Sequence, residues 1–131
     1  MDRRLRDLRA IGELTEAAFV ARQAEMAGLK RTELALRAQL SDLDAAKRAN
    51  AEAAEAMDPA TRAGADLLWQ SWVDSRRSAI NLTLARTLAE QSRVRTELAR
   101  SFGRNHAVGG LAARAKLASD LQRLRRAERD G

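Results

Sequence analysis

Apolar side chains recur along both halves of the chain at alternating steps of three and four residues. In residues 1–57 this spacing fits a heptad repeat in which eleven of seventeen a and d positions are apolar. The repeat includes Leu5, Leu8, Phe19, Met26, Leu29, Leu36, Leu40, Leu43 and Ala54. The second half continues the pattern with Val73, Ile80, Leu84, Thr87, Val94, Leu98, Val108, Ala112 and Ala115. Such spacing is typical of amphipathic helices that bury a narrow seam.

A turn signal separates the two periodic segments. Asp58 is a good N-cap residue, and Pro59 suits the first position of a helix, where its missing N–H costs nothing. Because proline disfavours helical geometry in the residue before it, the preceding helix should end near Met57. We therefore expect helix one at about 2–57, a turn at about 58–59, and helix two at about 60–128. The predicted fold is all-α: one domain, residues 1–131, forming a long two-helix antiparallel coiled-coil hairpin.

Folding the chain at residues 58–59 places residue i of helix one opposite residue 117 − i of helix two. Leu43 then faces Val73, and Phe19 faces Leu98. On this pairing helix one is exhausted near residue 116, so the remaining residues form a projecting C-terminal helical tail. The alternative is that Gly109-Gly110 bends the chain back over its own hairpin, since glycine weakens a helix by about 1 kcal/mol.

Composition agrees with helices and excludes several kinds of site. Ala, Leu, Arg, Glu and Lys account for 79 of the 131 residues, a bias typical of coiled coils. The strand-forming runs that a sheet protein needs are missing. Without cysteine and with a single histidine, His106, the sequence offers no thiol nucleophile and no multi-histidine metal site. We expect no enzyme activity and no cofactor, and a soluble cytoplasmic protein.

Charge and exposed apolar residues indicate where a partner binds. Residues 76–131 carry a net charge of +8 and residues 1–75 a net charge of −2, which favours an acidic partner. Trp72 is either a packing residue or an exposed anchor for that partner. The predicted partner-binding residues are the tail leucines, the tail arginines and this tryptophan: Leu117, Leu121, Leu124, Arg123, Arg125, Arg126, Arg129 and Trp72.

A small, basic, two-helix coiled coil with such a tail resembles the flagellar export protein FliJ family and its type III secretion counterparts. The local likeness lies in the C-terminal stretch from Phe102-Gly103-Arg104 through Leu117 to Leu124, and in the start Leu5-Arg6-Asp7-Leu8-Arg9. The resemblance implies a non-enzymatic stalk in the central hole of a hexameric export ATPase. Its further partners would be membrane export gate proteins and export chaperones, which places it peripherally at the inner-membrane export apparatus.

Two other functions stay open at this stage. The chain is alternatively a generic coiled-coil adaptor or scaffold. It is also alternatively a basic coiled coil associated with nucleic acid, although aromatic residues for base stacking are scarce. No small-molecule substrate is expected under any of the three.

Overall fold

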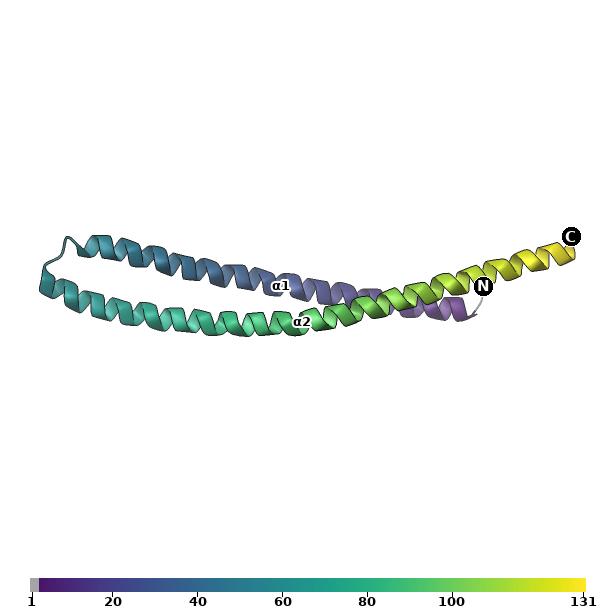
Figure 1. The fold of residues 1–131 in the computed structure, drawn as a ribbon, viewed down its shortest axis with the longest axis horizontal. Coiled ribbons are helices and arrows are strands. Elements are labelled where there is room, and N and C mark those ends of the chain that lie inside the picture. The colour runs from purple at the N-terminus through teal and green to yellow at the C-terminus, as the bar shows by residue number, and fades with distance from the viewer. Residues whose placement is uncertain (1–2) are drawn as a thin grey trace. The chain divides into compact units, whose positions relative to one another are not determined.

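The computed structural model describes residues 3–131, and these form two long helices packed against each other, with no strand among them (Figure 1). Helix α1 spans Arg3–Ala54 and helix α2 spans Pro59–Asp130. Neither helix, over the described residues, has a stretch apolar enough to cross a membrane. Asp2, the first residue of the predicted helix one, lies outside the described residues.

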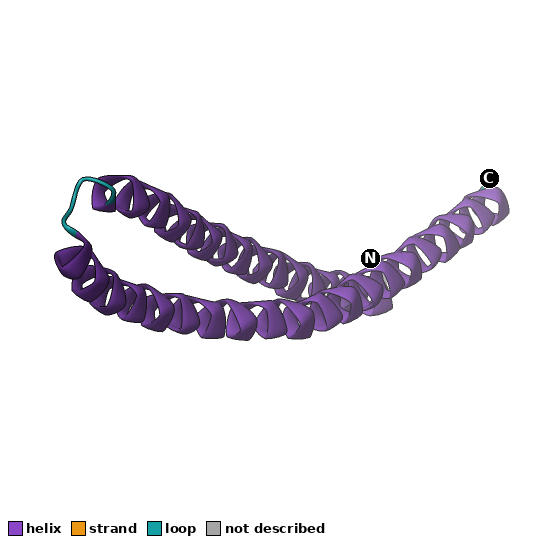
Figure 2. Ribbon diagram, turned by 60° about the vertical axis from the view of Figure 1, so that its left-hand side comes forward, coloured by secondary structure: helices purple, strands orange, loops and turns teal. Residues whose placement is uncertain are grey.

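The connection between the helices is a four-residue turn, residues 55–58, shown in teal in Figure 2. α1 therefore ends three residues before the predicted boundary at 57. Asp58 caps α2 as predicted, because its carboxylate accepts hydrogen bonds from the backbone N–H groups of Ala60 and Thr61. Ala56 and Met57 donate to carbonyls three residues back, at Ala53 and Ala54, which tightens the end of α1.

The chain forms two compact units, one of residues 27–92 and one of residues up to 26 together with residues 93–131. In the unit of residues 27–92, the core is a cluster of four buried aliphatic side chains with Leu40 packed against it. The buried four are Leu36, Leu43, Ile80 and Leu84. Polar bonds flank this core, since Gln91 donates to Glu33 and Arg77 pairs with Asp44.

In the other unit, α1 and α2 bury fewer apolar side chains between them and form more hydrogen bonds and ion pairs. Val94 is fully buried. Beside it, two residues of each helix form an ion-pair network of Arg22, Glu25, Arg93 and Glu97. Further along, Thr15 donates to the side-chain oxygen of Asn105 at 3.0 Å. The Phe19 and Phe102 rings lie 5.8 Å apart.

Burial confirms most of the predicted seam positions but not their pairing. Among the predicted a and d positions within residues 3–57, which the structure describes, Lys47 and Met57 are exposed, and the predicted position Met1 lies outside the described residues. Gly12 faces Val108, and the ring of Phe19 lies against that of Phe102. These two contacts lie three and four positions later in α2 than the predicted pairing, and the ion pair of Asp44 with Arg77 is also four positions later. The ion pairs of Arg22 with Glu97 and of Glu25 with Arg93 are two positions and one position later. Because α1 ends at Ala54, the connecting turn and the first helical turns of α2 extend beyond the end of α1. This shifts the pairing toward later residues of α2.

α2 is continuous through Gly109-Gly110. The alternative in which the chain folds back at this pair is therefore not observed. In Figure 1 the C-terminal end of α2 runs on past the beginning of α1.

Candidate functional site

The net positive charge of the protein is concentrated where α1 begins and α2 ends. Residues 3–9 and 114–130 contain ten basic and four acidic residues, a net charge of +6, whereas the remainder holds fourteen of each. Both segments belong to the same compact unit. The first turn of α1 contains no acidic residue, so its N-terminal dipole adds to the positive potential there. This end of the unit is the part of the molecule best suited to bind an anion.

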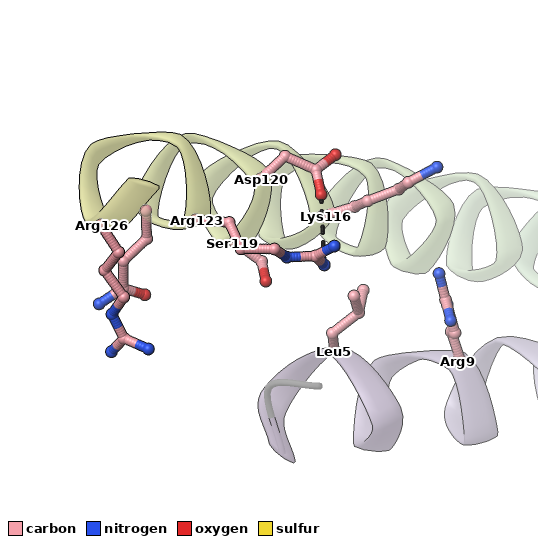
Figure 3. A pocket seen from close by; sticks show the side chains of 8 residues that line it. Leu5, Arg9, Lys116, Ser119, Asp120, Arg123 and Arg126 are labelled. Carbon is pink, nitrogen blue, oxygen red and sulfur yellow. Dashed lines mark ion pairs between the residues drawn. The ribbon is translucent and has the colours of Figure 1, made fainter. Parts of the chain in front are cut away.

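A groove between α1 and α2 lies within this basic end (Figure 3). Leu5 and Arg9 extend from α1 toward α2, and Arg123 forms an ion pair with Asp120 at 3.6 Å. Leu5 is buried. The lining is mostly cationic or polar: Leu5, Arg9, Lys116, Ser119, Asp120, Gln122, Arg123 and Arg126. Four cations against one carboxylate favour a carboxylate or phosphate ligand.

The structure divides the four predicted tail arginines between different surfaces. Arg123 and Arg126 line the groove, and Arg125 and Arg129 do not. The helical repeat explains this, because positions 123 and 126 share the side of α2 that faces α1, and position 125 is about 200° away from 123. Sequence reasoning missed the contribution of Arg9, which only the proximity of the two chain ends brings to the groove.

The three tail leucines are exposed, but for a different reason from the one predicted. Leu117 is 62% exposed although it lies about level with the first residues of α1. The half-buried residues in this part of α2 are Ala112, Ala115, Ser119 and Asp120. At about 100° per residue, Leu117 and Leu121 lie on the opposite side of the helix from Ala115 and Ser119. The leucines therefore point away from α1, and the length of the tail is not what exposes them.

The two tryptophans have different surroundings in the other unit. Trp69 is half-buried and lines a shallow groove with the small side chains of Ala51 and Ala54. Trp72 is 57% exposed, and its neighbour Leu68 is 77% exposed. Trp69 is thus a packing residue, and Trp72 is accessible to a partner.

An exposed aromatic stack was not predicted. Phe102 contacts Phe19 on one side and stacks on His106 on the other, with the ring centroids 6.0 Å apart and an interplanar angle of 15°. Phe102 is 57% exposed. The four-residue spacing of Phe102 and His106 on one helix was the available signal, but Phe19 joins them only through tertiary packing.

Comparison with protein-family models, with curated proteins and with solved structures finds no match to this chain. Function is therefore inferred from the charge, exposure and geometry of the residues described above.

Proposed function

We propose that this protein is a non-enzymatic stalk or adaptor of a flagellar, type III protein export apparatus. In this role it is an antiparallel coiled-coil hairpin whose paired termini, with the projecting C-terminal tail, enter the central hole of a hexameric export ATPase. It promotes the activity of that ATPase and the delivery of substrates or chaperones to the membrane export gate. The protein acts in the cytoplasm, peripherally at the inner-membrane export apparatus.

The observation that carries this proposal is the location of the charge. The whole net charge of +6 lies in residues 3–9 and 114–130, at the end that the stalk inserts. A ring of acidic residues attracts such an end over roughly a Debye length, about 8 Å at physiological salt. The near-neutral remainder of the chain supplies no competing attraction, so the charge also orients the stalk.

The groove residues and the tail residues make different kinds of contact with the ATPase ring. Arg123 and Arg126, in the groove with Arg9, pair with acidic side chains of the ring. The exposed leucines of the tail provide apolar contact area, since they have no partner on α1. Trp72 lies in the other unit and remains accessible to a gate protein or chaperone.

The test is stimulation of a hexameric export ATPase by the full-length protein and by two charge variants. Arg123→Gln combined with Arg126→Gln removes groove cations without shortening the chain. The matched control is Arg86→Gln combined with Arg95→Gln, which removes two exposed arginines of the same helix outside the basic end. We expect the groove variant to lose at least about tenfold in affinity, because each desolvated charge pair contributes more than about 1 kcal/mol.

Equal binding and stimulation by the groove variant and the wild-type protein would exclude insertion by the basic end. A protein that binds no export ATPase, yet binds another protein through the same arginines, would be the generic coiled-coil adaptor.

Nucleic acid is the second candidate ligand, since four cations around one groove also suit phosphates. Binding to duplex DNA should then fall steeply between about 50 and 200 mM salt. Absence of binding at about 50 mM salt removes this candidate.

A further inference from the structure

One side of α2 packs against α1, and a second row of residues runs along the opposite side of the same helix. We call it the rear face and define it as Gly103, His106, Gly110, Leu117, Leu121 and Leu124. All six are exposed. Their steps of three, four or seven residues keep them on one side of the helix, as in a seam that packs against another helix. Two glycines and His106 occupy the first half of this face, and leucines occupy the second half.

The glycines of the rear face have no role in the internal packing of the protein. A Cβ added at Gly103 or Gly110 would meet no atom within 4 Å, whereas one added at Gly12 would touch Val108. No glycine among the described residues has a positive φ that would require it. Glycine within a helix is unfavourable relative to alanine, so these positions weaken α2 without any gain inside the chain. Gly64 and Gly109 are equally open, and at the two glycines of the rear face this openness leaves room for another backbone to approach closely.

Charge is distributed asymmetrically along the two edges of the rear face. Arg100, Arg114 and Arg125 follow one edge, and residues 100–125 place no carboxylate on that edge. Among the described residues, no ion pair involves these three arginines. The opposite edge carries Phe102 and Asp120. The complement of this surface is apolar along its centre and acidic along one edge.

We propose that the rear face of α2 binds an amphipathic helix of a partner protein, with large apolar side chains along its centre and carboxylates along one edge. The large side chains of the partner pack over Gly103 and Gly110, and its carboxylates pair with Arg100, Arg114 and Arg125. The proposal rests on the function given above and deepens it, because it states the chemistry of the helix that the exposed tail leucines contact, on a surface separate from the basic groove.

A second copy of this chain fits the face less well. In an antiparallel pair of rear faces, Leu117 and Leu124 would lie over Gly110 and Gly103 of the other copy. Such a pairing brings identical edges together, so the arginine edge of one copy would lie beside the arginine edge of the other. Like charges at an interface oppose association. The arginine edge therefore selects an acidic helix.

The probe is a fluorescently labelled synthetic peptide of about 22 residues, which as a helix matches the roughly 32 Å from Gly103 to Leu124. It carries leucines at heptad spacing and glutamates along one edge. A second peptide has lysines in place of the glutamates. Binding to the full-length protein is measured by fluorescence anisotropy. We expect the acidic peptide to bind at least about tenfold more tightly than the basic one.

The decisive variant is Gly103→Leu combined with Gly110→Leu. Because leucine is a better helix former than glycine, the thermal midpoint should stay the same or rise, whereas affinity for the acidic peptide should fall at least about tenfold. Gly64→Leu is the control, since Gly64 is equally open but lies in the other unit. Arg114→Gln combined with Arg125→Gln should reduce affinity for the acidic peptide and, because it removes like-charge repulsion, should not reduce affinity for the basic peptide.

Three results would overturn the proposal. The first is equal affinity for the two peptides. The second is unchanged binding of the acidic peptide by the Gly103→Leu, Gly110→Leu variant. Peptide binding that is lost on replacing Arg126 of the groove, and not on replacing the glycines, counts as this result. The third is a dimer in sedimentation that this glycine variant dissociates, which would make the occupant a second copy. These measurements use no ATPase, so they succeed or fail independently of the stalk function.

Discussion

Gln91 of α2 donates a hydrogen bond from Nε2 to Oε1 of Glu33 in α1, over 2.8 Å. Gln91 is only 4% exposed, and it also reaches the backbone oxygen of Leu29 at 3.4 Å. A buried polar side chain in a seam is satisfied only when its partner lies opposite, so it favours one axial alignment of the two helices. The pair thus links α1 and α2 in a specific register within the unit of residues 27–92.

Replacing Gln91 should raise the pKa of Glu33 and should change the stability of the protein only slightly. The hydrogen bond from Gln91, followed by that from Arg37, lowers the pKa of Glu33. Gln91→Leu keeps the volume similar, so the unfolding free energy should change by less than about 1.5 kcal/mol. NMR titration should show the pKa of Glu33 moving up toward its ordinary value, with Asp44 unaffected as the internal control. An unmoved Glu33 would mean that Arg37 alone sets its titration.

Acid should destabilise the protein through three carboxylates. The guanidinium of Arg77 lowers the pKa of Asp44, and the Thr61 hydroxyl, followed by the N–H groups of Ala60 and Thr61, lowers that of Asp58. With Glu33, these groups bind fewer protons in the folded state than in the unfolded chain as the pH falls below about 5. The stabilising effect of these three carboxylates is complete above that pH. It is lost as the pH falls through their pKa values in the folded state.

Thermal unfolding between pH 6 and pH 2 measures this effect, with Asp58→Asn and Asp44→Asn as variants. Each variant should show a shallower fall of the thermal midpoint at low pH than the wild-type protein. Parallel curves for wild type and both variants would assign acid sensitivity to other carboxylates.

The narrow core should make single aliphatic truncations costly. Ile80 is 4% exposed and belongs to the cluster with Leu36, Leu43 and Leu84. Ile80→Ala should reduce the unfolding free energy by about 2–5 kcal/mol, because the surrounding side chains cannot fully close the cavity. Leu82 is two residues away on the same helix and 53% exposed, so Leu82→Ala should cost less than about 1 kcal/mol. Urea unfolding of both variants compares them, and similar losses would contradict the burial pattern.

The ion pairs of the other unit should contribute little to stability. Arg22 and Glu97 lie 3.0 Å apart, with side chains 37% and 35% exposed. Water screens such a pair, so a double-mutant cycle should give a coupling free energy of no more than about 1 kcal/mol. Raising the salt concentration should reduce the coupling further. A coupling that is large and insensitive to salt would show that Arg22, Glu25, Arg93 and Glu97 act as one cooperative network.

Truncations at different points of α2 should separate stability from binding. Residues 127–131 are exposed, so deleting them should leave the thermal midpoint within about a degree of wild type. Deleting residues 117–131 removes Ser119 and Gln122, which line the groove over Leu5. The buried Leu5 would then become exposed, and the midpoint should fall by several degrees. Circular dichroism melts of the two truncated proteins provide the comparison, and equal midpoints would mean that Leu5 gains nothing from the tail.

Local sequence determined most of the secondary structure and the identity of the buried positions. The long heptad pattern specified two amphipathic helices, because an α-helix repeats every 3.6 residues and a seam must stay on one side. Asp58 and Pro59 marked the start of α2, since capping depends on neighbouring residues alone. The charge asymmetry was likewise readable from the chain.

Tertiary structure decided which residues face each other. The contacts between the helices lie later in α2 than the predicted pairing, because the pairing depends on how the turn and the first residues of α2 extend beyond Ala54. The same alignment brought Arg9 to Arg123 and Arg126, joined Phe19 to Phe102, and left Leu117 and Leu121 on the side away from α1. Helical periodicity defines the faces of each helix separately, whereas the packing of α1 on α2 determines which face is covered and which remains open for a partner.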